Sequence, residues 1–323
     1  MRLLAGTVTA GRAGQKPGGR VWKPGAEALA PLACILFLVT AGQSAFGATY
    51  FLTVAGLGGE QDYEQRFQML ATDTDKLLRD SPGTDKVVET LKGPDATRPK
   101  LEAALGKIAA QAKPTDTFVL MLIGHGTFDG AEYKLNLPGP DISAPELAVL
   151  LNRIPASRQL IVNMTSASGG AVDTLKKEGR VIITATKSGT ERNATVFARF
   201  WVEALRDPAA DTDKNGTITA LEAFKYAQAK TVAFFADSKH LATEHAQLAD
   251  EARAATFTLV RFGSAAAETT DPAKRQLVAA KEEIENKIDA LKYEKDLMDA
   301  EDYRRQLTAL LIQLAKTQKE IDQ

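Results

Sequence analysis

The sequence has very little cysteine and no excess of charge of either sign. Its 323 residues include one cysteine, Cys34, which excludes an internal disulfide framework and any metal cluster held by several thiolates. The 40 basic and 41 acidic side chains leave a net charge of −1, which argues against a nucleic-acid-binding protein. The remaining composition, 44% hydrophobic and 25% charged, is that of an ordinary globular protein with one large domain or two small ones.

The N-terminal region lacks an apolar run long enough for a stable membrane span. Residues 28–41 form an apolar run of 14 residues, too short to cross a ~30 Å hydrocarbon core. Five basic residues precede this run, and Ala45 and Gly47 follow it, an order typical of a secretory signal. We therefore predict a signal peptide over 1–47 and a periplasmic or secreted mature protein. The alternative is a buried core helix.

Removal of this segment would change the protein in two ways. Cys34 would leave with the signal peptide, so the mature chain would have no thiol. Five basic residues and Glu27 would also leave, so that 35 basic and 40 acidic residues would remain, a net charge of −5.

From Thr49 onward, short apolar runs alternate with helical segments. This alternation is typical of an α/β domain with a mostly parallel sheet and helices on both faces, here predicted over 48–263. The predicted strands are 50–56, 87–91, 117–124, 158–165 and 180–186, and the predicted helices are 63–79, 96–112, 143–154, 168–178, 196–206 and 221–235.

The C-terminal region has a different pattern, with apolar residues at helical spacing on either side of residues 299–302. After a linker at 264–272, we predict an αα-hairpin of coiled-coil type over 273–323. A single long helix with a stutter is the alternative. The apolar stripes of this hairpin could bind a partner protein, or they could pack against each other or against the main domain.

Two polar motifs follow neighbouring predicted strands. His125 lies in Gly-His-Gly after the strand 117–124, and Ser166 lies in Ser-Ala-Ser-Gly-Gly after the strand 158–165. Because working residues of parallel sheets lie at the carboxyl ends of the strands, we expect both side chains at one edge.

This pair of motifs resembles the caspase/legumain clan of peptidases. The stretch 183–193 and the helix that follows are similar to the bacterial legumain-like (peptidase C13) branch, and the resemblance extends over about 49–262. It implies a caspase-like sheet with a catalytic dyad of His125 and residue 166. It also implies an oxyanion hole formed by the backbone N–H groups of Gly126 and residue 166.

The sequence departs from that clan at the nucleophile, because Ser166 stands where the clan has cysteine. A thiol, with a pKa near 8.5, ionises beside an imidazole, whereas a hydroxyl needs a base that is usually oriented by a carboxylate. We therefore expect a catalytically inactive pseudo-peptidase that binds a peptide or protein. The alternatives are a serine-type endopeptidase or transpeptidase that uses His125 and Ser166, and a structural protein in which the site has no role. Asp129 is the nearest acid in sequence, although a solvated loop aspartate is the simpler interpretation.

The other two histidines, His240 and His245, do not form a recognisable metal motif. They lie five residues apart, so they do not share one helix face as metal ligands four apart would. We interpret them as structural residues rather than as a zinc site.

A separate motif, at residues 211–222, matches the twelve-residue EF-hand loop in full. We predict a structural Ca²⁺ site in which the ligands are Asp211, Asp213, Asn215, Thr217, Thr219 and Glu222. Carboxylate, amide and carbonyl oxygens suit this cation, and Gly216 makes the sharp turn. A solitary extracytoplasmic loop would bind at about 10⁻⁴ to 10⁻³ M. The alternative is a capping box, since Thr219 and Glu222 also fit the start of a helix.

Overall fold

The computed structural model describes residues 47–83, 85–262, 272–295 and 298–322. The predicted signal peptide, with Cys34, and the predicted linker lie outside these ranges except for Gly47 and Pro272, so both stay predictions. Among the described helices, none combines the length and the apolar character needed to cross a membrane.

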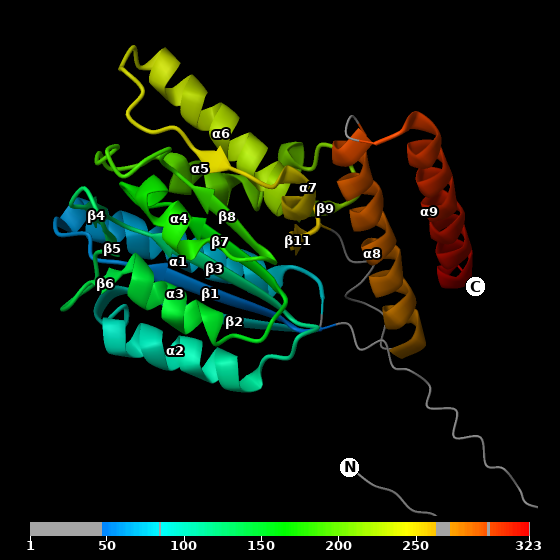
Figure 1. Cartoon of the computed structure of the whole chain (residues 1–323), viewed down its shortest axis with the longest axis horizontal. Coiled ribbons are helices and arrows are strands. Elements are labelled where there is room, and N and C mark those ends of the chain that lie inside the picture. Colours follow the sequence, from blue (N-terminus) through cyan, green and yellow to red (C-terminus); the bar gives the residue numbers. More distant parts are fainter. Residues whose placement is uncertain (1–46, 84, 263–271, 296–297, 323) are drawn as a thin grey trace, which may run out of the picture. The chain divides into compact units, whose positions relative to one another are not determined.

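The centre of the fold is a six-stranded sheet with the order β10-β8-β7-β3-β1-β2 (Figure 1). All neighbouring strands are parallel except β10, which runs antiparallel to β8. The strands are β1 (Thr49–Ala55), β2 (Lys86–Leu91), β3 (Thr117–Ile123), β7 (Arg158–Asn163), β8 (Arg180–Thr184) and β10 (Gln247–Leu248). The prediction of a mixed α/β fold with a mostly parallel sheet is confirmed.

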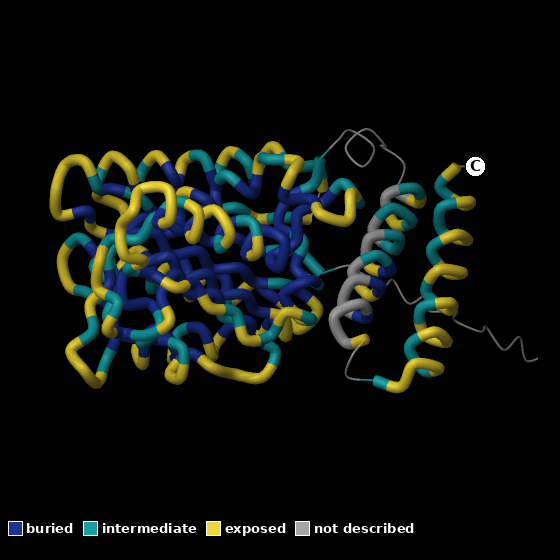
Figure 2. The backbone as a smooth tube through the Cα atoms, turned by 90° about the horizontal axis from the view of Figure 1, so that it is seen from above, coloured by how far each residue is buried: buried dark blue, intermediate teal, exposed yellow. Residues whose placement is uncertain are grey.

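Helices cover both faces of this sheet. One buried cluster joins side chains of α1, α5 and α6 to the strands, and a second joins those of α2, α3 and α4. The helices are α1 (Gln61–Asp80), α2 (Arg98–Gln111), α3 (Ala144–Asn152), α4 (Val172–Leu175), α5 (Phe197–Ala204), α6 (Ala220–Asp237) and α7 (Glu251–Ala254), with 3₁₀ turns η1 (Gly93–Asp95), η2 (Ser168–Ala171) and η3 (Pro208–Ala210). The central strands are therefore buried from both sides (Figure 2), which explains their uninterrupted apolar sequences.

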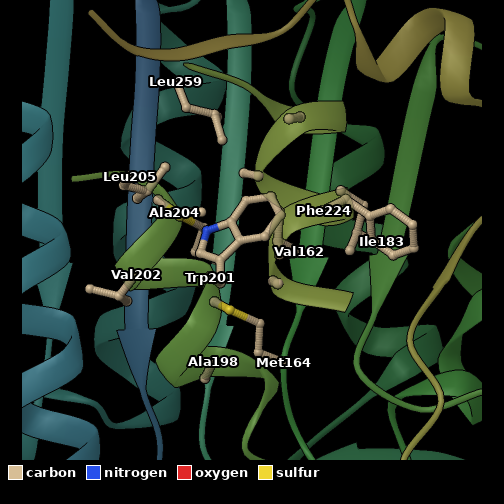
Figure 3. Close-up of a cluster of buried hydrophobic side chains, with 14 of the residues drawn as sticks. Val162, Met164, Ile183, Ala198, Trp201, Val202, Ala204, Leu205, Phe224 and Leu259 are labelled. Carbon is tan, nitrogen blue, oxygen red and sulfur yellow. The ribbon is translucent and has the colours of Figure 1, made fainter. Parts of the chain in front are cut away.

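Trp201 of α5 occupies the centre of the first cluster, where it is fully buried. Figure 3 shows it among Val162, Met164 and Leu259. Burial of a large apolar side chain contributes about 1.5–3 kcal/mol. Because Met164 lies two residues before Ser166, this packing also fixes the chain that leads into the candidate site.

Two small sheets complete the fold, and neither was predicted. A three-stranded antiparallel sheet contains β4 (Gly126–Phe128), β5 (Tyr133–Leu135) and β6 (Ile142–Ser143). A two-stranded sheet pairs β9 (Thr217–Thr219) with β11 (Thr258–Arg261).

The predicted helix 168–178 is much shorter in the structure, where only η2 and α4 form. A side chain at Gly169 would lie 2.3 Å from the Ser188 backbone, so this segment is held close to the neighbouring loop. The Gly-Gly sequence also disfavours a regular helix, because glycine loses the most backbone entropy when it becomes ordered.

The C-terminal region forms two helices, α8 (Pro272–Glu294) and α9 (Ala300–Ile321), which contact each other. Asp299 begins α9, because its carboxylate accepts the N–H groups of Glu301 and Asp302. A side-chain cap of this kind starts a helix, so the described residues contain two helices rather than one long one.

Candidate active site

His125 and Ser166 meet at one edge of the sheet. His125 follows β3 and Ser166 follows β7, and these two strands are parallel neighbours. The Nδ1 atom of His125 lies 3.4 Å from the Oγ atom of Ser166. The adjacency expected from the parallel-sheet rule is therefore present.

The imidazole of His125 is half-buried against two aromatic rings. The rings of Tyr63 and Phe67 contact it edge-on, with centroid separations of 4.8 and 5.1 Å. Burial lowers the pKa of His125, and a hydrogen bond with the Gly58 backbone and the charge of Glu60 only partly oppose this shift. The imidazole is therefore neutral near pH 7 and able to accept a proton, but it is a weakened base.

Within the described ranges, no carboxylate forms a hydrogen bond or ion pair with His125. The carboxylate of Asp129, the nearest acid in sequence, accepts the N–H groups of Ala131 and Glu132 in its own loop. These hydrogen bonds lower the pKa of Asp129. Asp129 is thus a turn-stabilising residue, and the third member of a Ser-His-Asp triad is missing from the described site.

A buried polar network lies beneath Ser166, which is itself only 2% exposed. The Tyr133 hydroxyl lies 2.6 Å from the Thr165 hydroxyl and 3.3 Å from Oδ1 of Asn163. The next residue, Ala167, has a φ of 55°, an uncommon left-handed conformation for alanine. Ser166 therefore lies between Thr165, whose hydroxyl is hydrogen-bonded, and Ala167, whose backbone is left-handed.

Gly126 is required by close approach. A Cβ atom at this position would lie 2.5 Å from the Tyr133 ring and 2.6 Å from the Ser166 carbonyl oxygen, so a larger residue would displace one of them. Gly126 therefore lies against the Ser166 backbone. Its role in an oxyanion hole, and that of the Ser166 N–H group, stay predictions.

Two further carboxylates, Glu191 and Glu244, lie close to the site but were not identified from the sequence. Glu191 pairs with His245 at 2.5 Å, and the buried carboxylate of Glu244 accepts the N–H group of Val196. Glu191 is 54 positions from His245 in the chain. No local motif joins the two, so only the fold reveals this cluster. His240 is exposed.

The aspartate loop forms a compact set of oxygen atoms. Carboxylate oxygens of Asp211, Asp213 and Glu222 lie within 4.8 Å of one another. The carboxylate of Asp211 accepts N–H groups from Asn215 and Gly216, and Gly216 has a φ of 83°, which glycine adopts readily. Hard oxygen donors around a tight turn fit the chemistry of Ca²⁺.

The capping box predicted as the alternative is also present. The Glu222 carboxylate accepts the backbone N–H and the hydroxyl of Thr219, while the Glu222 N–H donates to that hydroxyl. The second Glu222 oxygen accepts the Thr212 N–H group. Helix capping and loop closure therefore use the same carboxylate.

No family model matches this sequence, and no curated protein matches it. Solved structures similar to the chain include protein GSU0716 from Geobacter sulfurreducens, at 15% identity and a TM-score of 0.40, over 70% of this chain and 95% of the other. Caspase-1 from Spodoptera frugiperda is similar at 12% identity and a TM-score of 0.42, over 63% and 86%. The Drosophila initiator caspase Dronc is similar at 10% identity and a TM-score of 0.37, over 58% and 73%.

Proposed function

We propose that this chain is a caspase-like peptidase homologue of the legumain type that binds a peptide or protein partner without hydrolysing it. The observation that carries the proposal is the pair His125 and Ser166, with side chains 3.4 Å apart and no hydrogen-bonded or ion-paired carboxylate at the imidazole among the described residues. The arrangement has the parts of a dyad but lacks what a hydroxyl nucleophile needs.

Serine and cysteine need different help from the imidazole in the same geometry. A neutral imidazole can ionise a thiol before the reaction, but it must take a hydroxyl proton during the attack. In a Ser-His-Asp triad, disabling the acid lowers kcat by about 10⁴. Burial of His125 weakens the base further. A hydrolytic rate close to background follows.

The second candidate is a serine-type endopeptidase or transpeptidase. It is favoured by one observation, that the His125 Nδ1 atom faces the Ser166 hydroxyl at near hydrogen-bonding distance. Distances of this kind can shorten when substrate binds.

Peptide-library cleavage by the chain from Ala48 onward separates the two candidates. We expect no cleavage by wild type and measurable cleavage by Ser166→Cys, which would be lost again in a Ser166→Cys, His125→Ala double variant. Cleavage by wild type that Ser166→Ala abolishes would instead establish the serine-type enzyme.

We further propose that residues 211–222 bind Ca²⁺ in a structural role. The ligands would be Asp211, Asp213, Asn215, Thr219 and Glu222, together with the Thr217 carbonyl. Asp211 and Glu222 are buried, and buried carboxylates gain most from a cation that neutralises them. β11 pairs with β9, which forms residues 217–219 of the loop itself, so the main domain supports this side of the site.

The mature protein is proposed to be periplasmic or secreted, and the α8–α9 hairpin to be a surface for a partner protein. Mass spectrometry of the exported chain should find Ala48 at its N-terminus. Affinity capture with and without residues 272–323 tests the hairpin, and loss of a specific partner on truncation is the expected result.

A further inference from the structure

The loop between β8 and α5, residues 185–196, is attached directly to the segment that carries Ser166. The Ala167 N–H group donates to the Glu191 carbonyl at 2.7 Å, and the Thr195 hydroxyl donates to the Met164 carbonyl at 2.6 Å. These contacts lie on either side of Ser166. The position of the β8–α5 loop therefore affects the position of the serine.

A second segment, residues 238–246 between α6 and β10, holds this loop from its other side. The Glu191 carboxylate accepts the backbone N–H groups of Lys187 and His245, at 2.9 and 3.1 Å, and pairs with the His245 ring. Glu244 accepts the Val196 N–H group at 2.7 Å and the Phe197 N–H group at 3.4 Å. Two adjacent residues thus fasten the α6–β10 segment to the loop.

Glu244 is an unusual anchor because its side chain is almost completely buried, with 3% exposure. Burial raises its pKa to about 7, and the Glu191 charge adds to this rise, while the Val196 and Phe197 amides oppose it. The other charged or titratable groups at this contact are His245, next to it in the chain, and Lys187, whose Nζ atom lies 3.6 Å from Glu191. Glu244 therefore gains or loses its proton near neutral pH, because its burial outweighs the two amides that favour the charged form.

We propose that Glu244 is an acid-favoured latch that holds the β8–α5 loop, and with it Ser166, in place and loosens as the pH rises. The latch does not rest on the proposed function. The latch itself depends on the contacts described above.

The direction of the effect follows from linkage. In the closed state the pKa of Glu244 is about 7, whereas in an open, solvated segment it would return to about 4.3. Protons therefore favour the closed state between these two values, and closure weakens as the pH rises through this window. Between pH 5 and pH 8 the opening equilibrium should rise on the order of a hundredfold.

Hydrogen exchange of the amides in 185–196 and 238–246, corrected for the intrinsic effect of pH, measures this opening. We expect the rise with pH in wild type and a nearly flat profile in Glu244→Gln, which stays neutral and keeps an acceptor for Val196. Glu146→Gln removes a helix-capping carboxylate elsewhere and should leave the profile of these two segments unchanged.

Two results would overturn the latch. One is a flat corrected profile in folded wild-type protein. The other is a slope that persists in Glu244→Gln and disappears in His245→Gln, which would assign the effect to the histidine instead.

Alkylation of Ser166→Cys by iodoacetamide gives an independent readout at the site itself, without any peptide. Since the mature chain contains no other cysteine, the introduced thiol would be the only target. At pH 8 we expect slower alkylation when Glu244→Gln is added, because residue 166 is buried in the closed state. Equal rates with and without Glu244→Gln would count against the latch, whereas failure to find a bound peptide would count only against the proposed function.

Discussion

The Tyr133 hydroxyl lies 2.6 Å from the hydroxyl of Thr165, the residue that precedes Ser166. Both residues are buried, and burial raises the pKa of Tyr133 to about 12. The tyrosine therefore remains a neutral donor at any physiological pH. Because β5 supplies Tyr133 and the end of β7 supplies Thr165, this contact ties the small sheet to the central one.

Replacement of Tyr133 by phenylalanine should destabilise the protein by about 0.5–1.5 kcal/mol, because it removes the hydroxyl that bonds to Thr165 while Thr165 and Asn163 keep their bond to each other. Chemical denaturation of Tyr133→Phe measures this loss. Tyr303→Phe on α9, where no residue is buried, is the matched control and should change stability by less than about 0.5 kcal/mol. Equal midpoints for Tyr133→Phe and wild type would show that the network contributes nothing.

The central sheet could be predicted from the sequence because its strands carry their own signal. The run TFVLMLI of β3 is buried along almost its whole length, and an uninterrupted apolar run has few other solutions in a soluble domain. Once parallel order was inferred, the meeting of His125 and Ser166 followed from the shared edge of the strands.

The parts that could not be predicted depend on distant contacts or on very short elements. β6 contains two residues, and β5 three, too few for a periodic pattern to appear. Glu244 contacts the N-terminus of α5 from 48 positions away, and its neighbours in sequence give no sign of burial. The partner of β9 was missed for the same reason, since β11 lies about 40 residues further along the chain.

The hairpin should lose stability in an uneven way when its apolar residues are truncated. Ile288 on α8 is 7% exposed, whereas Leu311 on α9 is 48% exposed. Ile288→Ala should cost about 2–4 kcal/mol of local stability, and Leu311→Ala should cost less than about 1 kcal/mol. Hydrogen exchange of α8 and α9 gives both values, and comparable losses would show that the buried face has been assigned to the wrong side.

Glu146 provides a pH-dependent contribution at the start of α3. Its pKa is lowered to about 2, first by the Ser143 N–H group and then by Arg98 and the Ser143 hydroxyl. A lowered pKa means that the charged form stabilises the fold, so the contribution is complete above about pH 4.3 and fades as the pH falls towards 2. Because the side chain is 45% exposed, solvent screening limits the effect of Glu146→Gln to about 0.5–1 kcal/mol at pH 7.

Urea denaturation of Glu146→Gln at pH 7 and pH 3 tests this sign. The difference from wild type should shrink at pH 3. Glu102→Gln also removes a partner of Arg98 but caps no helix, so it should show the smaller loss at pH 7. A difference that grows in acid would contradict the assignment.

Calcium should raise the melting temperature of the wild-type chain through the loop 211–222. At a Ca²⁺ concentration 100 times the dissociation constant, binding to the folded state alone stabilises by about 2.7 kcal/mol, which corresponds to a shift of several degrees.

Asp213→Asn tests the site with little damage to the fold, because Asp213 is exposed and its substitution leaves the Glu222 capping box untouched. We expect that variant to lose most of the shift, while Mg²⁺ at equal concentration produces little in either protein, since it prefers a smaller octahedral site. An equal calcium response in Asp213→Asn and wild type would move the effect away from this loop, and no response in wild type would leave Glu222 with its capping role alone.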